Sequence, residues 1–521
     1  MYRSLVLPAL SLALAASGQN LAPVVNITST ALDLGAATAT ITYDLSDTEN
    51  DPSEVTLRAS LNGGLTWQVP VTQVSGDVGA GILPGTGRTI TWAFDGVPNI
   101  WEAVVMVVAD DGHAPDIQTM VDQVDAQNLA GLLEVVAIPR HYSSHLAGIQ
   151  AIRDTLLGRF NGMDIEVGTQ DVVVLGTNVP NVIGRQAGLR YDTLTYIVDA
   201  HYDAVSNTPG ADDNASGVVA TLEIARILSQ YRFRNSLRYI GFSFEEQGLI
   251  GSGYYVQSGI PAWERIDGVL NLEMIGYYSD EPNSQQVPAG FNILFPDAIA
   301  ALAANDYRGD FLTVVGNTAS NSLVETCLDA VDTYVPELSR IALVVPGNGQ
   351  IAPDLRRSDH ARFWDVGMKA LMLTDGSEFR NANYHTPNDA IATLDIPFLV
   401  NCTKATLATA AMLAEPMNAG FDTHPLGSVG MDDHQHGFPC GVDVYPNPAK
   451  DLLWIHVHDC VGRTVSAQLF ALDGRRVAGR DLRFSGVDER QALPLHGIAR
   501  GTYLLVLQAG DAHTTLKVEV E

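Results

Sequence analysis

Two histidines and three carboxylates in the middle of the chain could bind divalent metal ions together. These candidate ligands are His201, Asp213, Glu246, Glu273 and His385. Imidazole with carboxylate suits zinc better than magnesium or calcium, which prefer shells made only of oxygen. Two divalent ions bound by three carboxylates leave a net charge of +1, which a bound hydroxide neutralises. Two metal ions that act together in hydrolysis also need an anion that bridges them. The sequence therefore predicts a site for two Zn²⁺ ions per chain.

Each of these residues has a simpler explanation when it is taken alone. A histidine or aspartate at a strand end is more often structural, and adjacent glutamates usually lie on a solvated surface. Glu245 and Glu246, however, directly follow an apolar stretch that ends at Phe244, so at least one carboxylate should be buried. Because a buried carboxylate without a partner is costly, a cation is the natural compensation. Five such positions in one segment favour a metal site.

The segment 121–415 must supply the elements that bring these residues together. Apolar strands alternate with helical periods in it, which predicts an α/β domain with a mostly parallel, mixed sheet flanked by helices. The expected strands are 194–198, 237–244, 266–272 and 370–374, and the expected helices are 218–228 and 397–413. Every candidate ligand falls at a strand end or on the following loop, where such sheets build their sites. The segment 278–353 is longer than a crossover needs and is a candidate for part of a substrate pocket.

Short strands without a helical period flank this domain, so we expect it to lie between two all-β sandwich domains. Residues 23–111 alternate β-rich runs with turns such as Asn62-Gly63-Gly64. They resemble the fibronectin type III-like modules attached to exported bacterial enzymes. A module of this kind is more often a spacer or a contact surface than a catalytic unit.

Residues 441–521 form the second β-rich segment. Tyr445-Pro446-Asn447-Pro448, Leu472-Asp473-Gly474 and Gly501-Thr502-Tyr503 follow one another as in C-terminal sorting domains of type IX secretion, which this segment resembles. One departure is the ending Val-Glu-Val-Glu, which is more acidic than the usual basic finish. The alternative is an ordinary terminal sandwich that stabilises the chain.

The two ends together predict export. Residues 1–18 have the charge, apolar run and small terminal residues of a signal peptide, and residues 416–440 have the composition of a linker. We expect a secreted or cell-surface protein, exported through the periplasm of a Gram-negative bacterium and recognised by the secretion machinery through its C-terminal domain. Two disulfides in three possible pairings could form, with Cys440–Cys460 the simplest. The four cysteines are Cys327, Cys402, Cys440 and Cys460.

The composition limits the remaining partners. Sixty acidic and thirty basic residues give a formal charge of −30, so no binding to nucleic acid is expected. No stretch after the signal peptide is expected to span a membrane, because a span needs roughly 20 apolar residues.

The motifs around the candidate ligands occur together in one known family. They are His201-x-Asp203, Gly210-Ala-x-Asp213-Asn-x-Ser-Gly, Glu245-Glu246, Asn271-x-Glu273-Met-Ile-Gly and Tyr384-His385-Thr-Pro-x-Asp. In this order they resemble the aminopeptidase S and aminopeptidase Y family of di-zinc exopeptidases. The resemblance covers 121–415 and implies a secreted metallopeptidase that hydrolyses N-terminal bonds of peptides and proteins.

The same resemblance implies a role for each residue. Asp213 would bridge the two zinc ions, with His201 and Glu273 completing one site and Glu246 and His385 the other. Catalysis would use a metal-bridging water, with Glu245 as its general base and Tyr384 stabilising the oxyanion. Asp203 would orient His201. The family often has Asp at this position. Glu273 keeps the negative charge of that residue but has a longer side chain. Ser358-Asp359-His360 also fits the family's pattern, either as pocket lining or as a structural turn.

Other functions remain open at this point. A glutaminyl cyclase shares the fold but acts on N-terminal glutamine with a single zinc, and a carboxypeptidase of this fold is also possible. A non-catalytic surface receptor or adhesin belongs to a different class, and such proteins usually lose ligands or the base. Every expected position is filled here, which favours catalysis, and the metal stoichiometry separates the cyclase.

Overall fold

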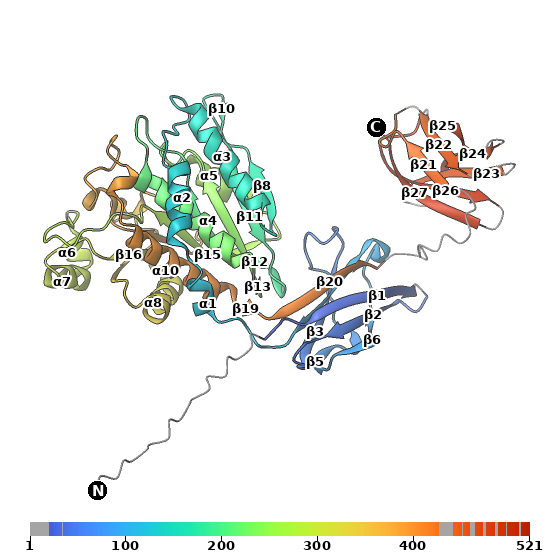
Figure 1. Cartoon of the computed structure of the whole chain (residues 1–521), viewed down its shortest axis with the longest axis horizontal. Coiled ribbons are helices and arrows are strands. Elements are labelled where there is room, and N and C mark those ends of the chain that lie inside the picture. Colours follow the sequence, from blue (N-terminus) through green and yellow to red (C-terminus); the bar gives the residue numbers. More distant parts are fainter. Residues whose placement is uncertain are drawn as a thin grey trace, which may run out of the picture. The chain divides into compact units, whose positions relative to one another are not determined.

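The computed structural model describes residues 20–33, 35–426 and 441–520, the last range without 451, 459–463, 472–475, 485–487, 496 and 510–511. The chain divides into two compact units, Met1–Gly427 and Ser428–Glu521 (Figure 1). The signal peptide expected at 1–18 and the cysteines Cys440 and Cys460 lie outside the described residues.

An eight-stranded mixed sheet forms the centre of the first unit, as the sequence predicts. Its strand order is β17-β16-β18-β15-β12-β14-β11-β8, and β12, β14, β15 and β18 run parallel. Strand β11 is antiparallel to both neighbours, and β16 is antiparallel to β18. The strands are β8 (Glu166–Gln170), β11 (Asn181–Gln186), β12 (Tyr191–His201), β14 (Asn235–Phe242), β15 (Arg265–Glu273), β16 (Leu312–Asn317), β17 (Arg340–Val345) and β18 (Leu371–Thr374).

Helices cover both faces of this sheet. One face packs against α1 (Ile117–Val121), α2 (Ala126–Val136), α3 (Leu146–Asn161), α4 (Gly217–Leu228), α8 (Asn321–Tyr334) and α10 (Ile396–Ala414). The other face packs near α5 (Ile250–Tyr254), α6 (Phe291–Leu294), α7 (Pro296–Ala304) and α9 (His360–Asp365). Each face of the sheet has its own hydrophobic core, and successive side chains of β12 pack into them alternately. Tyr196 and Val198 belong to the core of the first face and Ile197 to that of the second. Alternation of side chains along a strand explains this division.

Helix α10 is long and apolar enough to cross a membrane by length and composition, but 61% of its most apolar window is buried inside the protein. Asp395 caps its first turn by accepting from the Phe398 N–H. Cys402 on α10 and Cys327 on α8 are both buried and both free. The two disulfides considered from the sequence would need both of these thiols and therefore do not form, because each thiol packs in the core as a small apolar side chain.

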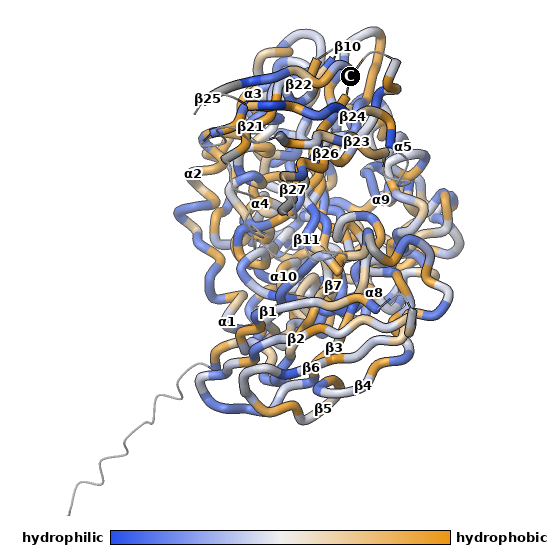
Figure 2. The backbone as a smooth tube through the Cα atoms, turned by 90° about the vertical axis from the view of Figure 1, so that its right-hand side faces the viewer, coloured by the Kyte–Doolittle hydropathy of each residue, from blue (hydrophilic) through white to orange (hydrophobic). Residues whose placement is uncertain are grey.

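Two four-stranded sheets share one hydrophobic core, and all their strands but β20 precede the central sheet in the chain. The first has the order β1-β2-β6-β4 and the second β20-β7-β3-β5. Polar and apolar residues alternate along β3, which is visible as blue and orange in Figure 2. The strands are β1 (Val24–Asp33), β2 (Thr38–Ser46), β3 (Ser53–Ser60), β4 (Val74–Gly76), β5 (Gly79–Ile82), β6 (Gly85–Ala93), β7 (Val104–Asp110) and β20 (Ala419–Pro425).

Strand β20 corrects the prediction of a linker at 416–440. The chain leaves α10, pairs β19 (Pro416–Met417) with β13 (Arg232–Phe233), and then adds β20 to β7. Within β20 only Ala419 is buried, so the segment lacks the apolar alternation that marks a strand in sequence. It is an edge strand, and edge strands are commonly polar. Residues 427–440 lie outside the described part.

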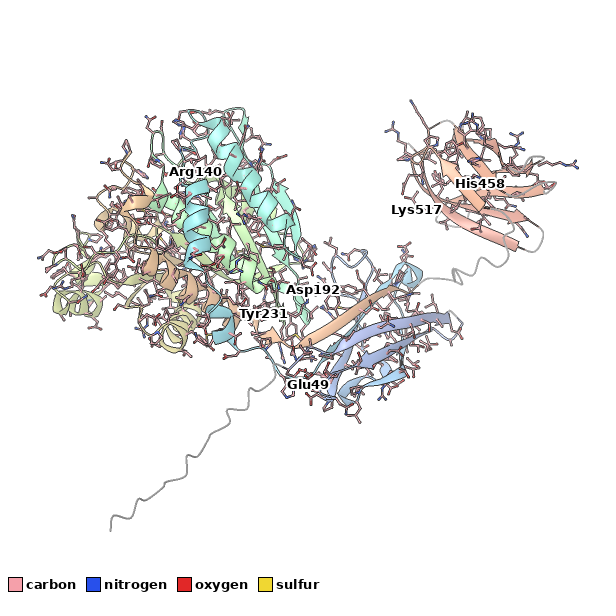
Figure 3. The ribbon with its side chains drawn as sticks, viewed as in Figure 1. Glu49, Arg140, Asp192, Tyr231, His458 and Lys517 are labelled. Atoms are coloured by element: carbon pink, nitrogen blue, oxygen red, sulfur yellow. The ribbon has the colours of Figure 1, made fainter. Side chains whose placement is uncertain are left out.

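Arg58 connects these sheets to the central eight-stranded sheet of the unit. It donates from β3 to the carboxylate of Asp192 at 2.5 Å and to the carbonyl of Leu189 at 3.0 Å. Asp192, labelled in Figure 3, also accepts the N–H of Trp67 at 3.0 Å. The side chains of Arg58 and Asp192 are only 12% and 3% exposed. A buried ion pair of this kind is costly to break on one side.

The second unit is all β, and its sheets have the orders β21-β22-β25 and β24-β23-β26-β27. Leu453, Ile455, Leu469 and Leu505 contribute to the hydrophobic core shared by these strands. The strands are β21 (Gly441–Tyr445), β22 (Leu452–His458), β23 (Thr464–Ala471), β24 (Arg476–Arg483), β25 (Asp488–Pro494), β26 (Gly501–Ala509) and β27 (Ala512–Val520).

The Arg58–Asp192 pair gives the first prediction. Asp192→Ala should lower the free energy of unfolding of the first unit by about 3–5 kcal/mol, because the Arg58 charge stays buried without its partner. The matched control is Asp154→Ala, whose exposed pair with Arg153 should contribute less than about 1 kcal/mol. Urea denaturation measures both, and equal losses in the two variants would contradict the prediction.

Candidate active site

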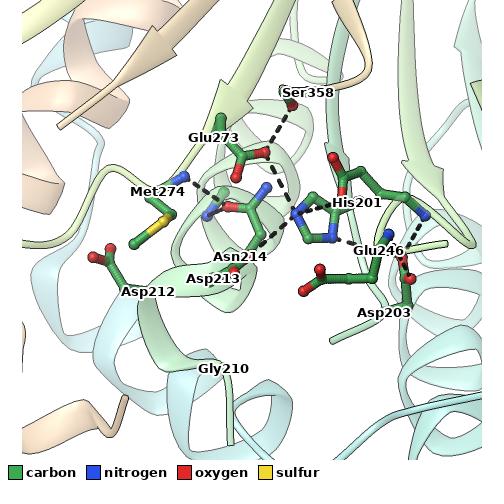
Figure 4. A network of polar contacts seen from close by, with 12 residues as sticks. His201, Asp203, Gly210, Asp212, Asp213, Asn214, Glu246, Glu273, Met274 and Ser358 are labelled. Carbon is green, nitrogen blue, oxygen red and sulfur yellow. Dashed lines mark hydrogen bonds and ion pairs between the residues drawn. The ribbon is translucent and has the colours of Figure 1, made fainter. Parts of the chain in front are cut away.

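The candidate ligands converge at the carboxyl edge of the central sheet. His201 is the last residue of β12 and Glu273 the last of β15, and the two strands are parallel neighbours. Glu245 and Glu246 follow β14, Asp213 precedes α4, and His385 lies on the loop between β18 and α10. Figure 4 shows Glu273, Asp213 and Glu246 around the His201 ring. The candidate ligands therefore lie at the carboxyl ends of the parallel strands and on the loops that follow, as expected from the sequence.

The polar atoms form two groups that Asp213 joins. The Nε2 atom of His201 lies 3.3 Å from Oδ1 of Asp213, 3.4 Å from Glu273 and 4.0 Å from Glu245. In the second group, Nε2 of His385 lies 3.0 Å from Oδ2 of Asp213 and 3.2 Å from Glu246. The two oxygens of one carboxylate thus serve different groups, which is the arrangement required of a bridging ligand.

The adjacent glutamates enter different groups because the backbone turns sharply before them. Phe244 has a left-handed φ of 54°, which ends the alternation of β14. Glu245 then joins His201 and Glu273, whereas Glu246 joins Asp213 and His385. Glu246 is also held by the Val205 N–H, which donates to its Oε1 at 3.1 Å.

Burial makes this concentration of carboxylates electrostatically unfavourable. It raises the pKa of Glu245 well above its ordinary value and the pKa of Glu246 to about 7. Burial acts against protonated imidazole in His385, but hydrogen bonds to Asp213 and Glu246 raise the pKa of this ring to about 10. Asp213 keeps a lowered pKa despite its burial, because the rings of His201 and His385 lie 3.3 and 3.0 Å from its two oxygens. The site is thus short of positive charge.

The donor set fits divalent cations. Both ring nitrogens of the fully buried His201 lack a hydrogen-bond partner in the described part of the chain. Buried polar groups are almost always satisfied, so these nitrogens indicate a missing partner. Mixed imidazole and carboxylate donors, gathered in two groups that share one carboxylate, suit two zinc ions.

Asp203 contacts more than the sequence analysis predicts. Its Oδ1 lies 3.6 Å from Nδ1 of His201, close to the ring it was expected to orient. Its two oxygens also accept the N–H groups of Glu245 at 3.1 Å and Glu246 at 3.2 Å. One carboxylate therefore fixes the backbone of both glutamates, a role that could not be predicted from residue types.

Other supporting residues were quoted in motifs without a specific role. Asp389 accepts the N–H groups of Asp212 at 2.9 Å and Asp213 at 3.1 Å. Ser358 donates to Glu273 at 2.7 Å, so it touches the site rather than only forming a turn. In the sequence, their positions in the Tyr-His-Thr-Pro-x-Asp and Ser-Asp-His motifs were the indication that they belong to the site.

Tyr384 lies beside the second group. Its ring stacks on His385 with centroids 3.7 Å apart, and its hydroxyl oxygen accepts from Arg357 at 3.1 Å. Burial and the nearby carboxylates raise the pKa of Tyr384, so its hydroxyl stays protonated. Arg357 also pairs with Glu378. Neither its motif nor its spacing distinguished Arg357 in the sequence.

A mainly apolar pocket opens next to Glu273 and Tyr384, with an empty volume of about 820 Å³ including its mouth. Its apolar wall includes Phe291, Ile299, Val315, Leu343 and Met372. Four of these five come from the segment 278–353, which the sequence analysis proposed as part of a pocket. Arg357 and Glu378 line the same pocket.

Comparison with known families separates the two units. Residues 181–410 match peptidase family M28, and this range includes all five candidate ligands. Residues 443–521 match the secretion system C-terminal sorting domain, in agreement with the resemblance noted in the sequence.

Three relatives illustrate the similarity. The chain is 33% identical over 238 residues to the uncharacterized protein YfbL of Escherichia coli, covering 43% of this chain and 68% of that protein. It is 25% identical over 356 residues to a probable zinc metalloprotease of Pyrenophora tritici-repentis, covering 59% and 71%. It is 29% identical over 217 residues to the aminopeptidase YwaD of Bacillus subtilis, covering 40% and 39%. The family match over residues 181–410 agrees with the order of the candidate ligands and with their place at the sheet edge. The chain therefore belongs to peptidase family M28.

Proposed function

We propose that this protein is an exported di-zinc aminopeptidase of the aminopeptidase S and Y type. One observation carries the proposal: two groups of imidazole and carboxylate donors, both in contact with Asp213, lie beside an apolar pocket. Two relatives are named as a zinc metalloprotease and an aminopeptidase, which supports the same chemistry.

The residues of each group would hold one ion. His201 and Glu273 would bind the first zinc and Glu246 and His385 the second, with Asp213 between them. Bound zinc would supply Lewis acidity toward the substrate carbonyl and toward water. Asp203, Asp389 and Ser358 would keep the ligands in place through the hydrogen bonds described above.

Glu245 would act as the general base. Its carboxylate is buried beside His201, and the raised pKa shows that it holds a proton more readily than an ordinary glutamate. A base of this kind takes a proton from the attacking water and delivers it to the leaving amine. The Tyr384 hydroxyl would donate to the carbonyl oxygen as negative charge develops there, and the Arg357 N–H holds the phenol oxygen in position.

The pocket would bind the side chain of the N-terminal residue. Its wall is mainly apolar, and Glu378 at its edge is paired with Arg357, which leaves this carboxylate less available to a cationic substrate side chain. Burying a large apolar side chain contributes about 1.5–3 kcal/mol. We therefore infer a preference for leucine, methionine or phenylalanine at the N-terminus of the substrate.

The flanking segments fit export. The match of 443–521 to a sorting domain points to a secreted or cell-surface protein. We propose that a signal peptide at 1–18 starts this route through the periplasm and that the secretion machinery recognises the second unit. The first two sheets would be a fibronectin type III-like module that is completed by β20.

Metal content tests the proposal directly. The purified full-length protein should hold close to two zinc ions per chain, and removing them with a chelator should abolish hydrolysis of aminoacyl-p-nitroanilides. Elemental analysis gives the stoichiometry. A single zinc at full activity, together with cyclisation of an N-terminal glutamine peptide, would favour the glutaminyl cyclase. Two bound zinc ions without any hydrolysis would favour a binding protein.

The two adjacent glutamates should behave differently when each is replaced. Glu245→Gln should retain both zinc ions but lower kcat by roughly 10²–10⁴-fold, the usual contribution of general acid–base catalysis. Its effect on KM should be smaller, because the interaction belongs to the transition state. Glu246→Ala should lose metal as well as rate. Zinc loss in Glu245→Gln with zinc kept in Glu246→Ala would reverse the two roles.

A filled pocket should change substrate preference. The wild type should hydrolyse leucyl and phenylalanyl p-nitroanilides with kcat/KM about 10–100-fold above the alanyl substrate. Ala298→Phe should remove most of this difference, because Ala298 lines the pocket. Ala300→Phe on the exposed side of the same helix is the matched control. A wild type that prefers lysyl or glycyl substrates would refute the apolar preference.

A further inference from the structure

Arg140 is an unusual residue in the first unit because its charge is fully buried without a direct ionic partner. Its side chain has no exposed surface, and it forms no salt bridge among the described residues. Figure 3 labels it between α2 and α3. Burying an unpaired guanidinium is unfavourable unless its donors are satisfied.

Backbone carbonyls satisfy this guanidinium, and most of them belong to the loop between His201 and Asp213. Its Nε donates to the Tyr202 carbonyl at 2.9 Å. Its two terminal nitrogens donate to Pro209 at 2.5 Å, Gly210 at 2.8 Å and Asp213 at 3.3 Å. Further bonds reach Val136 and Ile138. The Arg140 side chain therefore bonds to both ends of this loop. The loop begins at His201, a proposed ligand, and ends at Asp213, the carboxylate shared by the two groups.

Gly210 makes this approach possible. It has a left-handed φ of 56°, and a Cβ atom there would lie 2.9 Å from Nη2 of Arg140 and 2.3 Å from the Asp213 carbonyl. The position is labelled in Figure 4. A residue with a side chain would push the loop away from the guanidinium.

Arg140 also balances charge near the site. Burial lowers the pKa of Arg140, and four carboxylates oppose this shift. They are Asp213, Asp389, Asp203 and Glu246. Asp203 and Asp389 support the ligands without being proposed to bind metal themselves. A fixed cation therefore lies near two proposed ligands and near the two aspartates that support them.

We propose that Arg140 is the positioning residue that holds the His201–Asp213 loop in its metal-binding conformation before zinc arrives. The assignment rests on the proposed di-zinc function. Arg140 donates only to backbone carbonyls and is not among the proposed ligands or catalytic groups, so its effect would pass through Asp213 and His201. A lysine keeps the charge but lacks the planar fork of donors that spans several carbonyls.

Zinc affinity of the full-length protein tests this role. In chelator competition Arg140→Lys should bind zinc roughly 10–100-fold more weakly than the wild type, as expected for residues that support metal ligands. Excess zinc should restore most of kcat, with KM little changed. In the metal-free protein, amide hydrogens of residues 202–213 should exchange faster. Arg185→Lys is the control, because Arg185 is 4% exposed and bonds to Glu166 and the Asp192 carbonyl at the other end of β12.

A second variant covers the case in which Arg140→Lys does not fold. Gly210→Ala disturbs the same contact without removing the guanidinium and should also weaken zinc binding. Gly176→Ala, at a left-handed glycine with open space around it, controls for backbone strain. Wild-type zinc affinity in the Arg140 and Gly210 variants, with thermal stability lowered as in Arg185→Lys, would show a merely structural role. A wild type that retains no zinc would instead overturn the proposed function.

Discussion

The convergence of buried carboxylates at one sheet edge is the constraint on which the rest of the site depends. Asp213, Glu245, Glu246 and Glu273 approach two imidazoles within a largely buried space. Such a group is unstable without cations, because each carboxylate loses its hydration and repels the others. Zinc bound as proposed would resolve this problem, and it would also account for both nitrogens of His201 lacking hydrogen-bond partners in the described chain.

Several surrounding residues hold the carboxylates and the adjacent backbone in place. Asp203 and Asp389 fix backbone N–H groups of the ligand loops, and Ser358 fixes the Glu273 carboxylate. Arg140 closes the loop from the other side through backbone carbonyls. Hydrogen bonds to ligands and to the backbone beside them are a common way to orient metal sites. In the proposed function, the pocket would add selectivity through a separate set of apolar side chains.

The β modules have different relations to this core. The strand β20 follows α10 in sequence but completes a sheet that begins near residue 53, so the first module depends on chain from both sides of the catalytic segment. Arg58 and Asp192 add a buried ion pair between them. The second unit has its own hydrophobic core and matches a sorting domain, which fits a role in export rather than in catalysis.

The sequence alone predicted the mixed sheet and the candidate ligands, because strand ends are recognisable locally: an apolar run is followed by His201, by Glu245-Glu246 or by Glu273. Tertiary structure alone showed that Glu245 and Glu246 enter different groups, since the left-handed φ of Phe244 has no signature in residue type. It alone revealed β20, whose edge position allows a polar sequence that resembles a linker. Arg140 was equally hidden, because its partners are backbone carbonyls distant in sequence, and backbone atoms carry no residue identity to recognise.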